Sequence, residues 1–549
     1  MTHAGNAVIC LVLSIGAFAQ ADIFVKDEGV TNDLHRANVG RIVFAPKSDT
    51  TAEADFLKTF ELKETGDLAI RAFMQTSLTN YLHRLAPEKS SDELNRDGNY
   101  QIAFYVDGAL IHKEDLSPGS VAAENKKTKT IYTATLLDSA NKDSSWGRLW
   151  HIFMFSGGDR ALTAGKHVLK IEIRPYLRTG NEVKTGELIA RGDLPITVTK
   201  PTADEKLTAI QAIAPGSDWQ ISKETYNSGP IKELNRKIVE KVYKDLTSVV
   251  VIKNGKVLIE EYFNGADRST LHNTRSAGKS FASTMMGIAI GDGYIKSENQ
   301  TIKDFYDLHS FANYSPKKET VTLKSLLTMS SGFDANDDDQ NSPGNEEKMY
   351  PTENWVKFAL DVPMDDKTAV GEKWRYFTAG VVLLGDVIHK SVPGGLERYA
   401  DQKLFQPLGI KRYEWQHTPQ NVANTAGGLQ MSSLDFAKFG QLYKDGGRWN
   451  GKQIVPAEWI NKTFTKYLRV PYGPTLNYGY LFWNITYKVG DKQYEAFFAT
   501  GNGGNKIFVF KDQPLVIVIT GTAFGKWYMH RQVDDMMERH ILPAVVDSK

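Results

Sequence analysis

The chain carries TRSAGKSFASTMMGIAI at residues 274–290, and this stretch places a serine and a lysine at the start of an apolar helix. Ser276 and Lys279 are three residues apart, so a helix brings their side chains to one face. A serine hydroxyl is a weak nucleophile until a neighbouring base accepts its proton, and the lysine amine one turn along can be that base. Free backbone N–H groups at the helix start also favour developing negative charge. Ser276 is therefore a candidate nucleophile and Lys279 its candidate base.

The segments around this helix predict how the chain reaches it and where it ends. The β-rich runs 248–253 and 256–263 flank Asn254-Gly255, a combination that is typical of a tight β-hairpin. A polar loop follows and leads into the helix, for which Gly291-Asp292-Gly293 is a reasonable C-terminal stop.

A rival motif overlaps the same stretch. Gly278-Lys279-Ser280 resembles the end of a phosphate-binding loop, whose first glycine belongs at position 273. That position is Asn273, and the preceding segment is a polar loop rather than a buried strand. A nucleotide site is therefore not favoured.

Two later blocks extend the candidate site. Tyr376 precedes the apolar helical run 381–388, where it is either part of the core or, if it lies near Ser276, able to relay a proton. Residues 499–505 read ATGNGGN and are followed by two strand-like runs. Glycines at the start of a strand let a substrate approach the backbone. Taken alone, an ordinary hairpin loop is the simpler interpretation of these glycines.

Together and in this order, the three blocks resemble the serine β-lactamase and penicillin-binding protein superfamily, from about Leu207 to the end of the chain. The branch that they resemble most holds class C β-lactamases, D-Ala-D-Ala carboxypeptidases, related esterases and 6-aminohexanoate-oligomer amidases. Its nucleophile motif is Ser-x-x-Lys, which Ser276 and Lys279 match. The other matching positions are Tyr376 and Thr378, Asn502-Gly503-Gly504 in the place of Lys-Thr-Gly or His-x-Gly, and the blocks 326–333, 407–410, 426–432 and 442–447.

The resemblance implies hydrolysis through an acyl-serine intermediate. Lys279, partly desolvated between packed elements, would accept the proton of Ser276 directly or through Tyr376, and Tyr376 would protonate the leaving group. Two backbone N–H groups would stabilise the oxyanion: that of Ser276 and, by alignment to within one residue, that of Asn505. The other residues expected to contact the substrate are Thr378, Asn502, Gly503 and Gly504.

Two departures from the family pattern bear on the substrate. Enzymes that bind β-lactams well carry Lys or His where this chain has the uncharged Asn502, and Asn where it has Thr378. Both changes favour an uncharged or differently charged ester or amide, with a D-Ala-D-Ala carboxypeptidase or β-lactamase as the alternative. Several aromatic residues either line an apolar acyl pocket or belong to the core, the latter being favoured: Trp374, Trp415, Trp483, Trp527 and Tyr528.

An alternative of another class is a catalytically inert binding protein whose N-terminal part holds a glycan or a protein partner. The presence of Ser276, Lys279 and Tyr376 together argues against it, because an inert site has no reason to keep all three.

The composition limits the number of domains and the kinds of partner and cofactor that can be expected. The chain has 549 residues, enough for two or more domains, and 41% of them are hydrophobic. Its 66 basic and 65 acidic residues nearly cancel, which does not favour nucleic acid as a partner. The acidic loop 334–339 lacks the EF-hand pattern and the histidines lack zinc spacing, so neither a metal nor another cofactor is expected. The expected partner is a small-molecule or peptide acyl substrate, and the oligomeric state is not indicated.

The N-terminus has the features of a secretory signal peptide over residues 1–21. Residues 7–16 are apolar but too few to span a bilayer, and small residues at Ala17, Ala19 and Ala21 offer cleavage sites. The segment lacks Lys and Arg, and it holds the only cysteine, Cys10. An N-terminal anchor or buried segment is the alternative, but export to the periplasm or the medium is favoured.

The rest of the chain predicts a multi-domain protein. Residues 22–200 hold short alternating runs that predict an all-β sandwich of unknown role, in which Trp146, Trp150 and Phe153 are either a ligand platform or, more simply, core. A polar stretch near residues 200–206 marks the boundary. Residues 201–549 are expected to form an α+β, β-lactamase-like domain, with an antiparallel sheet flanked by helices and a helical subdomain.

Overall fold

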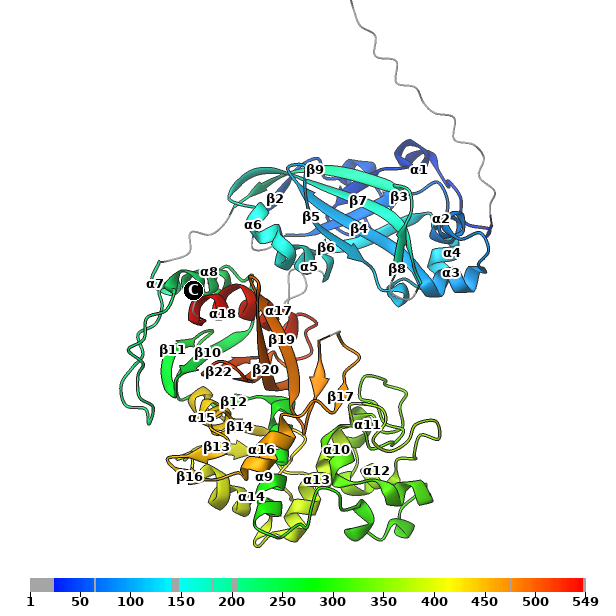
Figure 1. Cartoon of the computed structure of the whole chain (residues 1–549). Helices are drawn as coiled ribbons and strands as arrows, with labels where there is room; N and C mark the ends of the chain where they lie inside the picture. The colour runs from blue at the N-terminus through cyan, green and yellow to red at the C-terminus, as the bar shows by residue number, and fades with distance from the viewer. Residues whose placement is uncertain are drawn as a thin grey trace, which may run out of the picture. The chain divides into compact units, whose positions relative to one another are not determined.

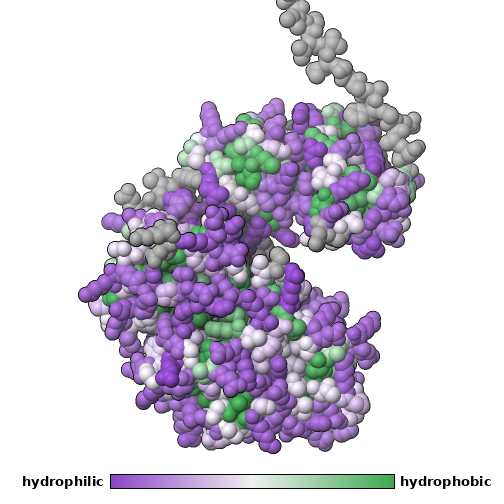
Figure 2. All heavy atoms as spheres, viewed as in Figure 1, coloured by the Kyte–Doolittle hydropathy of each residue, from purple (hydrophilic) through white to green (hydrophobic). Residues whose placement is uncertain are grey.

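The computed structural model describes residues 24–63, 66–139, 148–179, 182–199, 205–473 and 475–546. The chain divides into two compact units between Pro201 and Thr202 (Figure 1). The proposed signal peptide, Cys10 and Trp146 lie outside the described residues. Within the described ranges, no helix has the length and apolar character needed to cross a membrane. On the face drawn in Figure 2, the surface of each unit is mainly hydrophilic.

The N-terminal unit is built around two β-sheets. The smaller sheet has the order β1 (Ile42–Ala45), β3 (Leu68–Phe73), β6 (Ile131–Leu137) and is antiparallel. The larger has the order β2 (Phe60–Leu62), β9 (Ala190–Val198), β7 (Gly165–Thr179), β4 (Gly98–Val106), β5 (Ala109–Asp115), and β8 (Glu182–Thr185) pairs with β7. Strand β9 alternates buried and exposed residues along its length, as expected when one face of a sheet meets the core.

This unit also contains helices, which the prediction of an all-β sandwich did not include. Both sheets contribute side chains to one hydrophobic cluster, and residues of the helices join it. Polar residues that separate the apolar ones at helical spacing explain why these segments are not strands. The helices are α1 (Asp33–Asn38), α2 (Leu78–Leu85), α3 (Ser91–Asp97), α4 (Ala123–Thr128), α5 (Arg148–Phe153) and α6 (Asp159–Ala161).

The aromatic residues considered as a ligand platform are core residues where the structure describes them. Trp150 and Phe153 on α5 are fully buried, and their rings lie 5.1 Å apart. A cavity of about 640 Å³ in this unit is lined instead by other residues of α5 and β6, including Ile152 and Tyr132. The interpretation as core, which the sequence favoured, is therefore confirmed for Trp150 and Phe153.

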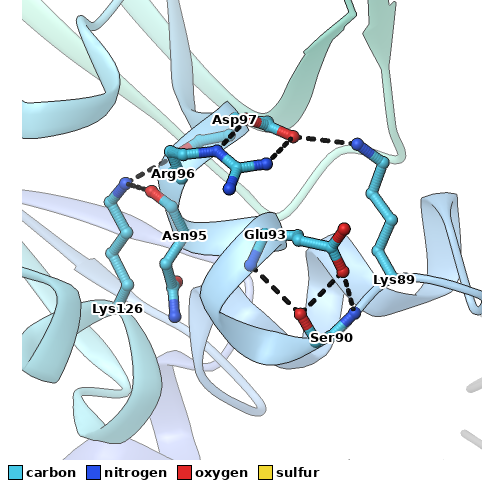
Figure 3. Close-up of polar contacts among 8 residues, drawn as sticks. Lys89, Ser90, Glu93, Asn95, Arg96, Asp97 and Lys126 are labelled. Carbon is cyan, nitrogen blue, oxygen red and sulfur yellow. Dashed lines mark hydrogen bonds and ion pairs between the residues drawn. The ribbon is translucent and has the colours of Figure 1, made fainter.

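A buried lysine ties α3 and α4 to the strands of this unit (Figure 3). Helix α3 begins with a capping box, in which Ser90 Oγ accepts from the N–H of Glu93 and Glu93 Oε2 accepts from the N–H of Ser90. The ammonium group of Lys126 donates to the carbonyls of Asn95, Gly98 and Pro118 at 2.6–2.7 Å. Burial lowers the pKa of Lys126 to about 8.

An antiparallel sheet forms the centre of the C-terminal unit. Its order is β11 (Lys256–Tyr262), β10 (Leu246–Lys253), β22 (Leu515–Gly521), β21 (Asn505–Phe510), β20 (Lys492–Gly501), β19 (Trp483–Val489), β18 (Asn477–Tyr478), β17 (Leu468–Arg469). The predicted hairpin is confirmed: β10 pairs with β11, and Asn254 and Gly255 both have positive φ.

Both faces of this sheet are covered, which explains why its central strands are apolar without alternation. Val250 and Ile252 on β10 face the cluster that includes α9 (Lys279–Gly291) and α15 (Ser433–Lys444). The opposite face meets helices from the end of the chain. There Lys506 pairs with Asp534 of α17 (Met529–Met536) at 2.7 Å, and Lys253 donates to the Val545 carbonyl of α18 (Leu542–Val545).

The segment between β12 and β17 forms the helical part of this unit (Figure 1). It confirms the predicted helices beside an antiparallel sheet. A small sheet of β12 (His272–Asn273), β14 (Leu429–Met431) and β13 (Tyr413–Trp415) joins it to the nucleophile turn. The further helices of this segment are α10 (Leu323–Leu327), α11 (Glu346–Met349), α12 (Trp355–Asp361), α13 (Thr378–Ser391), α14 (Gly395–Ala400) and α16 (Ala457–Thr463), and α8 (Ser228–Val239) precedes β10.

Candidate active site

Ser276 lies in a short 3₁₀ turn, Arg275–Gly278, that leads directly into α9. Lys279 Nζ lies 2.8 Å from Ser276 Oγ and donates a second hydrogen bond to the carbonyl of Ala426 at 2.7 Å. Lys279 is only 2% exposed, so its amine is held away from bulk water as predicted. The residue before the nucleophile, Arg275, has a positive φ of 52°, a conformation that is strained for a side chain of this size.

Tyr376 lies at the same place, although 100 residues separate it from Ser276. Its ring centroid is 5.1 Å from Lys279 Nζ, and its hydroxyl is near enough to the Ser276 side chain to interact with it. Burial raises the pKa of Tyr376, while the charge of Lys279 and the bond to Ser276 act in the opposite direction. The structure therefore brings Ser276, Lys279 and Tyr376 within reach of one another.

The strand that approaches the nucleophile turn is the end of β20. A Cβ atom on Gly501 would lie 1.8 Å from the carbonyl oxygen of Thr274 and 2.9 Å from the backbone nitrogen of Ser276. Only glycine permits this approach, because any side chain would overlap the turn. The next residue, Asn502, is exposed to solvent and directly follows the contact between Gly501 and the nucleophile turn.

The structure places Asn505, Gly503 and Gly504 differently from their predicted roles. The Asn505 side chain is fully buried and bonds with Gly521, donating to its carbonyl and accepting from its N–H at 3.0 Å. Gly503 and Gly504 have φ of 95° and 85° and close the turn between β20 and β21. Three glycines lie within four positions, and the contacts show that Gly501 is the one beside Ser276.

The two remaining predicted residues are held by loops. Thr378 is fully buried at the start of α13. The side chain of Asn502 accepts from the N–H of Gly525 at 2.7 Å, and its carbonyl accepts from Asn505 Nδ2. Asn502 thus fixes the loop after β22 to the end of β20.

The sequence analysis did not include two contributors to the site. Ala426 supplies the carbonyl that accepts a hydrogen bond from Lys279. A Cβ atom on Gly278 would lie 3.3 Å from Gly427, so the backbone of residues 426–427 packs closely against the nucleophile turn. The block 426–432 was visible as part of the family resemblance. Asp337, in the acidic loop 334–339, is the second: its N–H donates to the carbonyl of Tyr376 at 3.0 Å.

Two of the aromatic residues for which an acyl pocket was the alternative to core lie beside Tyr376. The ring centroids of Trp374 and Trp483 are 5.9 and 6.1 Å from that of Tyr376, and Tyr472 packs on both tryptophans. Trp415 and Tyr528 are buried elsewhere in the core, and Trp527 is 39% exposed. An apolar surface therefore adjoins the phenol, built from two of the five candidates together with Tyr472.

Comparison with known proteins places these elements in a family. A family model described as Beta-lactamase matches residues 239–535, which is more than half of the chain. An uncharacterized protein of Alkalihalophilus pseudofirmus is 22% identical over 239 residues, 38% of this chain and 62% of the relative, so this chain spans less than two thirds of that protein.

Solved structures show a distant likeness. A Bacillus anthracis protein, described provisionally as a 6-aminohexanoate-dimer hydrolase, is 18% identical with a TM-score of 0.47, over 60% of this chain and 90% of the other. An octameric penicillin-binding protein homologue from Pyrococcus abyssi is 20% identical with a TM-score of 0.43, over 56% and 75% of the two chains. On the strength of the family model, the chain belongs to the β-lactamase family, within the serine β-lactamase and penicillin-binding protein superfamily.

Proposed function

We propose that the C-terminal unit hydrolyses an ester or amide through an acyl-Ser276 intermediate. The observation that carries this proposal is the contact of 2.8 Å between Lys279 Nζ and Ser276 Oγ, with the Tyr376 phenol beside the same hydroxyl. A nucleophile, a base and a proton relay within one hydrogen-bond network are what covalent acyl transfer requires.

In the first half of the reaction, Ser276 Oγ attacks the substrate carbonyl carbon. Its proton passes to the amine of Lys279, directly or through Tyr376, and Tyr376 returns a proton to the leaving alcohol or amine as the acyl bond breaks. In the second half, a water molecule loses its proton to the same pair, attacks the acyl-serine ester and releases the acid. Microscopic reversibility gives the two halves the same proton route.

The oxyanion requires two backbone donors, and we assign these to the N–H groups of Ser276 and Asn502. The first follows from the position of Ser276 in the turn. The second rests on the contact of Gly501 with that turn, which makes the next peptide the nearest strand donor. Loss of one donor of this kind reduces the rate by about a hundredfold or more.

The charge of the site favours neutral acyl groups over β-lactams. The strand end that meets Ser276 reads Ala499-Thr500-Gly501-Asn502 and offers neither Lys nor His to a ligand carboxylate. Apolar rings of Trp374 and Trp483 lie beside Tyr376 instead. These features support an esterase or amidase, with a D-Ala-D-Ala carboxypeptidase or β-lactamase as the alternative.

The test is covalent labelling of the full chain with a fluorophosphonate, followed by intact mass. We expect one adduct in the wild type and none in Ser276→Ala; absence of labelling in both would favour an inert binding protein. A substrate panel of p-nitrophenyl butyrate, a small p-nitroanilide, nitrocefin and a D-Ala-D-Ala peptide then ranks kcat/KM. If nitrocefin or the peptide is turned over fastest, the preference for esters and amides is wrong.

A further inference from the structure

Asp337 makes three backbone hydrogen bonds around the start of α13. One carboxylate oxygen, Oδ2, accepts from the N–H of Thr378 at 2.7 Å, and the other, Oδ1, accepts from the N–H of Glu346 at 2.8 Å. The N–H of Asp337 itself donates to the carbonyl of Tyr376 at 3.0 Å. Thr378 and Glu346 are the first residues of α13 and α11, so one carboxylate satisfies an unpaired N–H at the start of each helix.

These bonds hold the backbone directly after the tyrosine. The Tyr376 carbonyl belongs to the first peptide unit after Tyr376, and the Thr378 N–H belongs to the second. Both groups are hydrogen bonded to Asp337. The negative charge also faces the N-terminus of the 14-residue helix α13, where the helix dipole favours an anion. Because the loop 334–339 has no regular secondary structure, its position at this point depends on such side-chain bonds.

We propose that Asp337 is a positioning residue for Tyr376, which keeps the phenol within reach of Ser276 and Lys279 by holding the start of α13. This inference rests on the proposed function, since it assigns a role in that reaction. Asp337 touches neither substrate nor the reacting atoms in this scheme. It acts through the peptide backbone that carries the phenol.

The positioning requires the ionised carboxyl group. A carboxylate accepts hydrogen bonds at both oxygens, whereas protonation turns one oxygen into a donor that opposes an N–H. Burial raises the pKa of Asp337 to about 6, and the charge of Glu346 raises it further, while the Thr378 bonds and the charge of Lys279 lower it. The titratable groups that face Asp337 are Glu346, Lys279, Tyr350, Tyr376 and Tyr472.

The sign of the pH effect follows from this. Above pH about 6 the carboxylate is ionised and holds both N–H groups, and as the pH falls through this value one bond is lost. We therefore expect kcat of the wild type to fall on acidification through pH 6. We assign this descending limb to Asp337, and its loss in Asp337→Asn would separate it from titration of the reacting groups.

The test compares Asp337→Asn with Asp339→Asn in the full chain. An asparagine has one acceptor oxygen, so its NH₂ group must face the second N–H. Asp339 is the matched control, because it is exposed in the same loop and its side chain accepts from the N–H of Asn341. kcat and KM for p-nitrophenyl butyrate are measured from pH 5 to 9, together with the thermal midpoint and circular dichroism.

We expect Asp337→Asn to lower kcat by about 10- to 100-fold with little change in KM, the effect of a slightly misplaced reactive group. Its pH profile should lack the limb near pH 6 that the wild type and Asp339→Asn show. An unchanged kcat, or a reduced kcat with the limb intact, would overturn the inference.

If the Asp337→Asn variant fails to fold, the wild type still tests the inference. A kcat that stays constant between pH 5 and pH 7 would contradict the proposed role of Asp337. Fluorophosphonate labelling separates the two proposals. If Ser276 in the wild type does not react, both the proposed function and the proposed role of Asp337 are wrong. If Ser276 reacts normally and only the Asp337 profile disagrees, the proposed function stands and the inference alone is wrong.

Discussion

At the residue scale, the site depends on a few short contacts that different parts of the chain supply. Lys279 is bonded on one side to Ser276 Oγ and on the other to the carbonyl of Ala426, so its amine has a defined direction. Tyr376 adds a phenol to the same hydroxyl. In the proposed mechanism these groups exchange one proton, so removing any of them should interrupt the same step.

The first prediction contrasts Lys279 with Asn502. Lys279→Ala removes the proposed base and should lower kcat/KM by about 100- to 10,000-fold, the usual range for general-base catalysis. Asn502→Ala removes only the side chain that accepts from Gly525 and leaves the backbone N–H, so its loss should be much smaller. Steady-state kinetics with p-nitrophenyl butyrate measure both. Equal and small losses would mean that the base has been misassigned.

At the element scale, buried polar side chains join helices and strands that lie far apart in the chain. Lys126 of α4 holds the end of α3 and the start of β4, and His272 on β12 bonds to Thr247 on β10 at 3.2 Å. Such groups lose hydration on folding and therefore stabilise the fold only while their partners remain in place.

Lys126→Ala should lower the free energy of unfolding of the N-terminal unit by about 2–4 kcal/mol, because three buried carbonyls lose their donor. Lys127→Ala is the control, since Lys127 is more exposed and pairs with the exposed Asp92. Its effect should be within about 0.5 kcal/mol. Urea unfolding followed by circular dichroism gives both values, and similar values for the two variants would contradict the structural role of Lys126.

The burial of His272 predicts how the free energy of unfolding changes with pH. Burial lowers the pKa of His272 to about 4, against an opposing effect of Asp267, so between about pH 6.5 and 4 the unfolded chain binds a proton that the folded chain does not. Stability from this residue is therefore lost on acidification, by up to about 1.4 kcal/mol per pH unit. The difference in unfolding free energy between wild type and His272→Gln should shrink from pH 7 to pH 4.5. A constant difference would show that His272 does not titrate in this way.

At the scale of the whole molecule, the chain consists of two units with separate hydrophobic cores. Ser276, Lys279, Tyr376 and Asp337 all belong to the C-terminal unit. Because each core is buried by its own unit, the C-terminal unit should fold and act by itself.

A fragment of residues 205–549 tests this expectation. We expect it to fold cooperatively and to retain the kcat/KM of the full chain for p-nitrophenyl butyrate. The fluorophosphonate should label Ser276 in the fragment at the same rate. A fragment that folds but is inactive would show that the N-terminal unit contributes to the site, which none of the contacts described here requires.

Local patterns in the sequence were sufficient to predict several secondary-structure elements and the contact at the centre of the site. Asn254-Gly255 between two β-rich runs predicted the β10–β11 hairpin, since a turn with two positive φ angles favours these residues. The spacing of Ser276 and Lys279 predicted their contact, because one helical turn sets the distance between them. The helices of the N-terminal unit were missed, because short runs of apolar residues do not separate strand from helix.

The sequence by itself determined the contact between Ser276 and Lys279 and the apolar strands, because each depends on residues within a few positions of one another. The tertiary structure decided which of several nearby glycines meets the nucleophile turn, which carbonyl holds Lys279 and which loop carboxylate faces Tyr376. Gly501, Ala426 and Asp337 reach their partners across some 40 to 230 positions of chain. Local spacing carries no information about such approaches, because they arise only when separate elements pack together and exclude water.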